Sequence, residues 1–342
     1  MKISGRYPCV IKMFDPEMIR MERDGAVINH INVDNSTEKS SLLWKIKKEY
    51  LGKSIVTICG AFIILLTAAI GIFLLVQGTG TFTRFHHTLW EFLFSSTWAP
   101  TDNSAQGGGS VGAAIYIFGS LLTCTLALLI VTPFAIGAAV FMTEIAPKAG
   151  TMVFQPAVEI FVGIPSVVYG WIGLTVLVPF IRDTFHAKIG GYSVLAASIV
   201  LAVMMFPTIT TVAADAIRSV PAAFRGAAYG IGSTRWQVIY RIVLPAAKTG
   251  IFSGIILGLA RAFGEALAVA MVIGKTRAFP KNILSPTNNL TAAIASDMGN
   301  SASGGEQNMA LWTMALLLFL ISMLFILLIH IISAKGKLKN GR

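Results

Sequence analysis

Two charged side chains, Arg261 and Glu265, stand inside an apolar stretch that spans residues 249–274. Arg261 lies near the middle of this stretch and hence near the bilayer centre, where an ionised side chain costs at least about 2.5–3.5 kcal/mol to insert. Glu265 follows one helical turn later, close enough to form a pair. The two residues are therefore either a structural ion pair that fixes helix register or part of an anion pathway. In such a pathway the planar guanidinium would bind the oxygens of a doubly charged oxyanion, which displaces Glu265.

A third candidate, Glu159, precedes the sequence Gly163-Ile164-Pro165 in another apolar stretch. Because proline lacks a backbone N–H, Pro165 is expected to kink the helix and to leave carbonyl groups free. Those carbonyls and the Glu159 carboxylate could line a cavity. Glu159 also lies near the cytoplasmic end of its stretch, so the alternative is a solvated carboxylate, and it ranks below Arg261 as a pathway residue.

Small residues recur at every fourth position along the stretch that holds Arg261. A stripe of this kind lets two helices approach closely, so we expect this face to pack against protein rather than lipid. Arg261 is three residues from the nearest glycine of the stripe and borders the packed face. The stripe comprises Gly250, Gly254, Gly258, Ala262, Ala266 and Ala270.

The sequence contains no motif for nucleotide binding or for protease chemistry. Residues 52–54 and 274–276 resemble the end of a phosphate-binding loop, but Lys47 and Val269 stand where that loop requires glycine. Neither an HExxH metalloprotease motif nor a GxGxxG dinucleotide fingerprint is present. We therefore predict no catalytic residue, no cofactor and no enzyme activity. If the protein moves a solute uphill, the energy comes from an ion gradient or from a partner ATPase.

Metal ligands are not gathered in the sequence either. Cys9, Cys59 and Cys124 share no C-x-x-C spacing, and the last two fall in apolar runs, as small buried residues do. His86 and His87 are adjacent and hence point apart, and no third ligand stands in sequence range. We predict neither a metal site nor a disulfide framework.

The composition is that of a membrane protein. Of 342 residues 55% are hydrophobic and only 13% are charged, and the mean hydropathy is +0.72. These values exclude an ordinary soluble globule and a disordered polyelectrolyte, so the lipid bilayer is the expected solvent. The net charge of +11 does not indicate nucleic acid, because long apolar stretches separate the basic residues.

Six stretches have the roughly 20 apolar residues that a helix needs to cross the hydrocarbon core. Each is far longer than the roughly ten alternating residues of a membrane β-strand, so we predict an all-α, polytopic membrane protein. The predicted spans are 54–76, 112–142, 153–181, 192–213, 249–274 and 309–332.

The lysine and arginine residues predict the orientation of these spans. Twenty of the 27 fall in the N-terminal segment, the links 143–152 and 214–248, and the C-terminal tail, whereas the opposite loops together hold six. Basic residues favour the cytoplasmic side. Both termini and the link 214–248 are therefore predicted to be cytoplasmic.

The aromatic residues of the opposite loop 77–111 predict a different environment. Trp90, Phe92, Phe94 and Trp98 cluster in a short segment of that loop. Amphipathic rings are favoured at the headgroup level, so we expect this segment to lie along the membrane surface.

The cytoplasmic link 214–248 predicts two short helices joined at glycine. Pro221 suits a helix start, Gly230 and Gly232 permit a break with positive φ, and Ser233 or Thr234 can cap a second helix that ends near Pro245. Ala227 and Ala228 have almost no side chain, so another protein could approach the first helix closely. The alternative is a merely amphipathic connecting loop.

This link resembles the "EAA" cytoplasmic loop of ABC importer permeases, whose pattern is E-A-A-x3-G-x9-I-x-L-P. Ala227-Ala228, Gly232 and Ile242–Pro245 match it, whereas Gly226 stands at the position of the glutamate. Two further strings, EIFVGIPSVVYG from Glu159 and GLARAFGE from Gly258, resemble the phosphate-specific permeases of the Pst system, PstC type. The resemblance covers residues 112–334.

The resemblance implies a six-helix type I ABC importer permease (MetI-like) fold in a bacterial cytoplasmic (inner) membrane. It implies phosphate as cargo, with a PstA-type second permease, a PstB-type ATPase dimer and an extracytoplasmic PstS-type phosphate-binding protein as partners. The implied ATPase-coupling residues are Ala227, Ala228, Gly232, Leu244 and Pro245, and the implied pathway residues are Arg261, Glu265 and Glu159.

Three alternatives remain on the sequence alone. The first is an ABC permease for another oxyanion, such as sulfate or molybdate. The second is an ion-gradient-driven transporter, and the third is a membrane scaffold in which Arg261 serves helix register only.

The predicted organisation has four parts. Residues 1–52 form a cytoplasmic extension whose role stays open, and residues 53–111 form the first span and an extracytoplasmic loop. Residues 112–334 form the permease core with its coupling loop 214–248, and residues 335–342 form a basic cytoplasmic tail.

Overall fold

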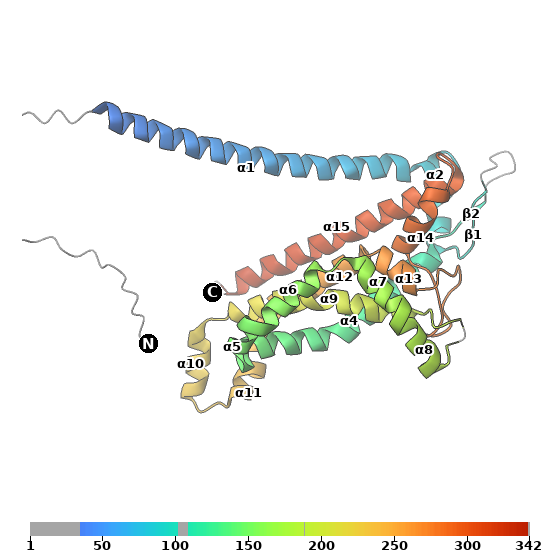
Figure 1. The fold of residues 1–342 in the computed structure, drawn as a ribbon. Coiled ribbons are helices and arrows are strands. Elements are labelled where there is room, and N and C mark those ends of the chain that lie inside the picture. Colours follow the sequence, from blue (N-terminus) through green and yellow to red (C-terminus); the bar gives the residue numbers. More distant parts are fainter. Residues whose placement is uncertain (1–34, 102–108, 188, 341–342) are drawn as a thin grey trace, which may run out of the picture. The chain divides into compact units, whose positions relative to one another are not determined.

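The computed structural model describes residues 35–101, 109–187 and 189–340 (Figure 1). In this part of the chain six helices are long and apolar enough to cross a membrane, which confirms the predicted number. The all-α prediction is also confirmed, since the two strands have two residues each. The six candidate spans are Gly52–Thr83, Ala114–Ile145, Ser166–Phe185, Val194–Arg218, Arg235–Phe263 and Glu306–Ile332.

The long helices are interrupted by short elements and by turns of π-helix, labelled η. From the N-terminus the chain forms α1 (Asn35–Gly78), α2 (Gly80–Thr83), α3 (Leu89–Phe94), β1 (Trp98–Ala99), β2 (Ser110–Val111), α4 (Ala114–Val140), η3 (Phe141–Ile145), α5 (Pro147–Ala149), η4 (Gly150–Phe154) and α6 (Gln155–Gly163). It continues with α7 (Ser166–Ile172), η5 (Gly173–Leu177), α8 (Val178–Phe185), α9 (Val194–Arg218), α10 (Ala222–Gly230), α11 (Arg235–Val238) and η6 (Ile239–Val243). The last elements are α12 (Leu244–Phe263), α13 (Leu267–Val272), α14 (Leu290–Asp297), the 3₁₀ turn η7 (Met298–Asn300) and α15 (Glu306–Asn340).

The chain divides into two compact units, Met1–Leu65 and Leu66–Arg342. In the described part of the first unit, the apolar side chains of α1 are exposed, Ile64 and Leu65 among them. Exposed apolar side chains over a helix of this length suit contact with lipid. All contacts described below lie within the second unit.

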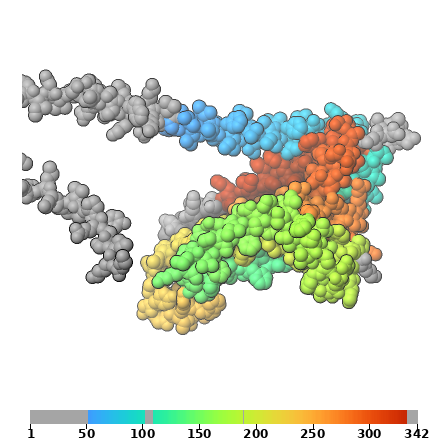
Figure 2. Space-filling view, viewed as in Figure 1, coloured from blue at the N-terminus to red at the C-terminus, as the bar shows by residue number. Residues whose placement is uncertain are grey.

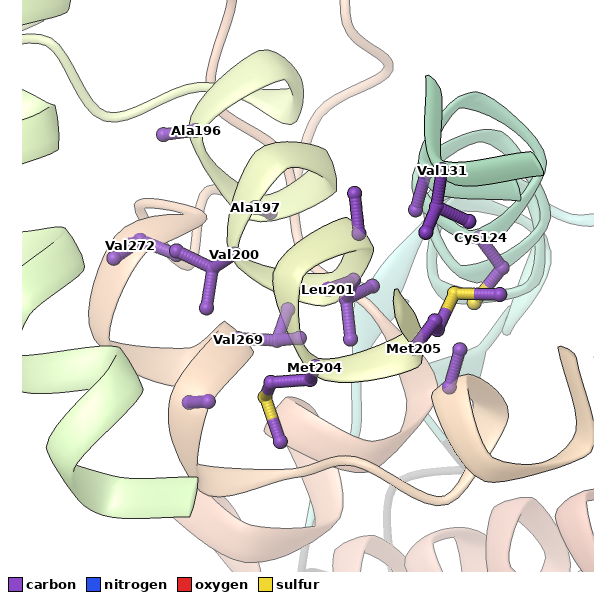
Figure 3. Close-up of a cluster of buried hydrophobic side chains, with 14 of the residues drawn as sticks. Cys124, Val131, Ala196, Ala197, Val200, Leu201, Met204, Met205, Val269 and Val272 are labelled. Atoms are coloured by element: carbon purple, nitrogen blue, oxygen red, sulfur yellow. The ribbon is translucent and has the colours of Figure 1, made fainter. Parts of the chain in front are cut away.

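Helix α9 is the centre of the second unit. Two thirds (67%) of the most apolar part of α9 is buried inside the chain, whereas the corresponding share is 6% for the span that contains α1 and 6% for the span in α15. Figure 3 shows Met205 of α9 beside Cys124 of α4, and Val200 of α9 beside Val272 of α13, all in one cluster of buried apolar residues. Because lipid is as apolar as these side chains, close packing rather than exclusion from water holds the helices together.

The small-residue stripe of α12 packs against α9, as predicted. A Cβ atom placed on Gly258 would lie 2.6 Å from Cγ1 of Ile209, and one on Gly250 would lie 2.5 Å from Cβ of Ala216. No side chain fits at such separations, so the two backbones approach as closely as glycine allows. The stripe ends at Ala262, because α12 itself ends at Phe263.

The predicted span 153–181 is wrong in its course, because the helix breaks fully at Ile164 and Pro165. Both residues are extended, with ψ of 127° and 139°, and α7 starts a new helix at Ser166. Pro165 cannot donate a backbone hydrogen bond, and proline disfavours helical backbone in the residue before it. The hydroxyl of Tyr169 donates to the freed carbonyl of Phe161 at 2.8 Å, which satisfies one of the carbonyl groups left by the break.

The predicted span 249–274 is also wrong in its course, since α12 and α13 are separate helices. The chain turns at Gly264, and the N–H of Glu265 donates to the carbonyl of Ala262 at 3.2 Å. The hydroxyl of Thr291 in α14 donates to the carbonyl of Glu265 at 2.7 Å. A contact from a distant helix thus satisfies the backbone at this break. Gly264 was not distinguishable in the sequence from Gly250, Gly254 and Gly258, which lie inside α12.

The elements of the second unit gather at two opposite ends (Figure 1). At one end, here called the loop end, α10 and α11 project beyond the long helices. At the other, here called the hairpin end, the antiparallel pair β1–β2 lies with α2 and α14. The predicted aromatic segment lies at the hairpin end and divides in two: Phe92 and Trp98 are buried, whereas Trp90 and Phe94 are exposed.

Candidate functional site

The predicted break at glycine in residues 214–248 is confirmed, but the second helix does not end near Pro245, because α11 continues through η6 and α12 to Phe263. Helix α10 follows Pro221, Gly232 has a φ of +84°, and α11 begins after Thr234. Thr234 and Gln237 form a reciprocal capping box, in which each side chain accepts from the backbone N–H of the other. The positive φ of Gly232 lies in the region that glycine adopts without strain, so the turn depends on this residue.

The two alanines of α10 face different ways. Ala228 is buried in a cluster with Val238, Val243 and other apolar residues, so it holds α10 to the bundle rather than meeting a partner. Ala227 and Gly226 are exposed. A small side chain at position 228 can therefore serve tight packing within the chain as well as close approach of a partner. The sequence alone did not distinguish these two reasons.

An exposed apolar surface covers the loop end, where α10 and α11 lie open in Figure 2. Ile231 is 84% exposed and Trp236 is 62% exposed. Several large exposed apolar side chains in one short segment are typical of an interaction site. It also includes Phe224, Tyr229 and Tyr240.

An ion pair fixes α10 to the end of the second membrane-crossing helix. Arg225 donates from Nε and Nη2 to Oε1 of Glu144, at 3.1 and 2.7 Å. Its guanidinium also donates to the carbonyls of Val220, at 2.6 Å, and Ile217, at 3.0 Å. The two side chains are only 22% and 11% exposed, so the pair is largely screened from solvent. Sequence reasoning missed it, since 81 residues separate the partners.

Arg235 adds a second contact between the link 214–248 and the same helix end. Its Nη2 donates to the carbonyl of Ile145 at 2.8 Å and to the carbonyl of Glu144. These carbonyls end the π-helical turn η3 and have no helical N–H to accept from. The loop that holds α10 and α11 is thus bound to η3 at two points.

Glu159 lies at the loop end. It is exposed, and its Oε1 accepts from Nε2 of Gln155 at 3.1 Å. Gln155 in turn accepts from Arg218, at the end of α9, at 3.2 Å. This network joins α6 to α9. Of the two roles considered for Glu159, a solvated carboxylate fits this geometry better than a carboxylate that lines a cavity.

Arg261 occupies the last turn of α12 and is exposed on the surface of the single chain. Its Nη1 donates to Oγ1 of Thr208 in α9 at 2.9 Å. The C-terminal end of a helix carries partial negative charge, which stabilises an arginine there.

The expected pair between Arg261 and Glu265 does not form. Because α12 ends at Phe263, the two residues no longer share one helical turn. Glu265 instead accepts from the N–H of Ala268 at 3.4 Å and so caps the start of α13. Among the described residues, the Arg261 guanidinium has no carboxylate partner, which leaves it able to bind an anion.

A buried polar cluster holds the hairpin end together. His87 Nε2 lies 2.6 Å from Oε1 of Glu306, and its Nδ1 lies 3.2 Å from Oε2 of Glu91. Glu306 is fully buried, and its Oε2 accepts from the N–H groups of Thr101, at 2.6 Å, and Gly109, at 3.0 Å. The partners are 219 residues apart at most, and no sequence pattern joins them.

Two opposing effects set the pKa of His87. Burial lowers the pKa, but the hydrogen bonds that Glu306 and Glu91 accept from the ring, together with the charges of the two carboxylates, outweigh burial and raise the pKa above its ordinary value. Across residues 35–101, 109–187 and 189–340, no three His, Cys, Asp or Glu side chains gather as metal ligands do.

Comparisons with known proteins identify the family. Residues 132–336 match the model of the family described as "Binding-protein-dependent transport system inner membrane component". The chain is 47% identical over 289 residues to a probable ABC transporter permease protein, YqgH, of Bacillus subtilis, covering 84% of this chain and 92% of the relative. It is 35% identical to the phosphate transport system permease protein PstC of Pasteurella multocida, covering 82% and 90%.

A solved structure supports the fold. The bacterial alginate ABC transporter, crystallised with an alginate-bound periplasmic protein, contains a chain that superposes with a TM-score of 0.52 at 20% identity. The match covers 86% of this chain and 97% of that one. The match over more than half of the chain, together with the PstC relatives, confirms the resemblance described above. The chain belongs to the binding-protein-dependent transport system inner membrane components, as a multi-pass permease subunit of an ABC importer.

Proposed function

We propose that this chain is a PstC-type permease subunit that carries inorganic phosphate across the bacterial cytoplasmic membrane. The observation that carries the proposal is Arg261, a permanently charged side chain at a helix break, exposed and without a carboxylate partner among the described residues. A guanidinium binds phosphate oxygens in pairs and stays ionised when partly desolvated. The identity with phosphate transport permeases over most of the chain supports the same cargo.

In this proposal the three candidate pathway residues have different roles. Arg261 binds the passing anion, while Thr208 holds the guanidinium in place through its hydroxyl. Glu265 supports the break that frees Arg261, because it caps α13 and its carbonyl binds Thr291. Glu159 has no contact with the anion in this proposal, because its exposed carboxylate is solvated and accepts from Gln155.

The exposure of Arg261 on a single chain fits a pathway shared between two permeases. A related PstA-type subunit would cover this surface, and a PstS-type binding protein would deliver phosphate at the hairpin end. The excess of basic residues at the termini and in residues 214–248 favours a cytoplasmic position for both termini and for the loop end.

A PstB-type ATPase dimer supplies the energy in this proposal. Its docking surface is the exposed apolar surface of the loop end, which also holds the exposed Ala227 and Gly226. Gly232 sets the turn between α10 and α11, and Leu244 and Pro245 begin α12, which leads to Arg261. Closure of the ATPases around ATP then moves the loop end and drives alternating access.

Reconstitution of the complex tests the proposal. The two permeases, the ATPase and the binding protein are placed in liposomes, and uptake of radiolabelled phosphate is measured with ATP, without ATP, and without this chain. We expect uptake only with ATP and only with this chain. Uptake that follows an imposed ion gradient in the absence of ATP would contradict the proposal and support an ion-driven transporter.

Another oxyanion, such as sulfate or molybdate, is the second candidate. A guanidinium fork fits the oxygens of any such anion, and the name of the relative from Bacillus subtilis gives no substrate. Competition in the same liposomes separates the candidates. Unlabelled phosphate should abolish uptake of labelled phosphate, and a tenfold excess of sulfate or molybdate should not.

A further inference from the structure

A polar pocket at the hairpin end lies apart from Arg261 and from the coupling loop. It has a volume of about 660 Å³ and is formed by the end of α1, the residue after α2, the segment 298–304 and the first turns of α15. It shares no residue with either candidate site. A volume of this size falls within the range of about 300–1,000 Å³ that small-molecule sites occupy.

The lining of this pocket, here called the Arg84 pocket, suits a phosphate group. Arg84 is its one charged lining residue, and its guanidinium forms no ion pair within the described ranges. The two carboxylates of neighbouring segments are already engaged: Glu306 binds His87, and Asp297 binds Arg277 at 3.2 Å. The pocket is therefore net positive, as an anion site must be.

Neutral hydrogen-bond donors complete the polar lining. Gln77 and Ser303 contribute an amide and a hydroxyl group, whereas the Ser301 hydroxyl donates to the carbonyl of Met298 and the Asn308 amide donates to Ser301. The backbone N–H groups of Ser303 and Gly304 have no acceptor within the described part of the chain, so they can also donate to a ligand. Arginine with such neighbours is the recurrent set that recognises phosphate oxygens.

The other side of the pocket is apolar. Trp312 lines it and packs edge-on against Phe73 of α1, with ring centroids 5.2 Å apart. Leu75 and Val76, just before the pocket on α1, are exposed. Tryptophan and arginine gather where a membrane-crossing helix leaves the hydrocarbon core. Free phosphate would leave this apolar wall without a partner, whereas a phospholipid would place its headgroup in the pocket and its acyl chains along α1.

We propose that the Arg84 pocket binds the phosphate group of an anionic phospholipid at the hairpin end of the bundle. The proposal uses the membrane location of the protein, which its family membership establishes, and is independent of the cargo. Free phosphate shares the chemistry that the lining recognises, so the test must separate the two sources.

Native mass spectrometry of the intact detergent-solubilised complex provides the test, with phosphatidylglycerol as the probe. Arg84→Gln should weaken binding of one phosphatidylglycerol molecule by about tenfold, since the charge-assisted hydrogen bonds are lost. Ser303→Asp, at an exposed loop position, should weaken it similarly by adding a negative charge. Arg182→Gln removes an exposed arginine outside the pocket and serves as the control.

The outcomes decide between the two sources of phosphate. Retention of the same number of lipids by the Arg84 and Arg182 variants would overturn the proposal. Displacement of phosphatidylglycerol by millimolar inorganic phosphate, in an Arg84-dependent way, would also overturn it, because the pocket would then be a site for the free anion. Loss of lipid in the Arg84 and Ser303 variants, unaffected by inorganic phosphate, is the expected result.

Discussion

The ion pair between Arg225 and Glu144 should determine how firmly α10 is held to the bundle. Arg225→Met keeps an unbranched side chain of similar reach but removes every donor of the guanidinium. It leaves the Glu144 carboxylate without its partner, and it leaves the carbonyls of Ile217 and Val220 without these hydrogen bonds. We expect α10 to detach locally while the membrane-crossing helices stay packed.

The burial of the pair sets the size of the effect. Breaking a buried ion pair by removing one partner costs about 3–5 kcal/mol, whereas an exposed pair contributes about 0–1 kcal/mol. Because the two side chains remain 22% and 11% exposed, the cost lies nearer the buried limit, at about 2–3 kcal/mol. Since about 1.4 kcal/mol is a factor of ten, local opening of α10 becomes about 30- to 150-fold more frequent.

Hydrogen–deuterium exchange of the assembled complex measures this opening directly. Peptides that cover residues 219–238 should exchange about 30- to 150-fold faster in Arg225→Met, and peptides from α9 should not change. Arg182→Met, which breaks the exposed pair with Asp183, is the matched control and should leave exchange at the loop end unchanged. In the same samples, the number of phosphate ions carried per ATP hydrolysed should fall only in the Arg225 variant.

A double-mutant cycle with Glu144→Gln completes the test. If the two side chains act through each other, the double variant should be little worse than either single variant. Unchanged exchange in Arg225→Met, or fully additive effects in the double variant, would refute the assignment of this pair as the tie that holds α10.

Three further predictions follow from the geometry. Gly258→Leu should prevent assembly of the complex, because a Cβ atom added at this position would lie 2.6 Å from Ile209. Gly60→Leu is the control and should assemble normally, because a Cβ atom added there would have nothing within 4 Å. Size-exclusion chromatography distinguishes the two variants. The pKa of His87 is raised, so its stabilisation is complete below the ordinary histidine pKa and is lost as pH rises through the raised value. The protection of hairpin-end amides relative to their intrinsic, base-catalysed exchange rate should therefore fall over that interval, and unchanged protection would contradict this. Gly226→Trp fits the fold, since the position is open, and should weaken ATPase binding in a pull-down; unchanged binding would exclude this surface as the docking site.

Patterns within single segments were predictable from the sequence. Hydropathy gave the number of spans, and the four-residue spacing of Gly250, Gly254 and Gly258 gave the packed face of α12. Gly232 and Thr234 marked the turn in the coupling loop, because positive φ and helix capping are local properties of one or two residues.

Features that depend on distant contacts were not predictable. The break after Phe263 contains Gly264, but α12 also holds Gly250, Gly254 and Gly258 without breaking, so glycine alone did not mark the break, and Thr291 from another helix stabilises it. An uninterrupted helix would have paired Arg261 with Glu265, and the break separates them. This break changes the interpretation of Arg261 from half of an ion pair to a guanidinium that is open to an anion.

The buried ion pairs show the same limit. No pattern in the sequence joins Arg225 to Glu144, or His87 to Glu306. Each residue by itself is an ordinary charged or titratable side chain in a loop or near a helix end. Only the fold brings the partners together, so only the structure identifies them.

Phosphate uptake by the Arg261 variants tests the central claim most directly. In liposomes that contain the assembled complex, Arg261→Gln should lower ATP-driven phosphate uptake by at least about tenfold, since the charge that binds the anion is gone. Arg261→Lys, which keeps the charge but loses the planar fork, should retain partial uptake. Arg182→Gln should transport normally. An Arg261→Gln complex that assembles fully and takes up phosphate at the unsubstituted rate would contradict the account.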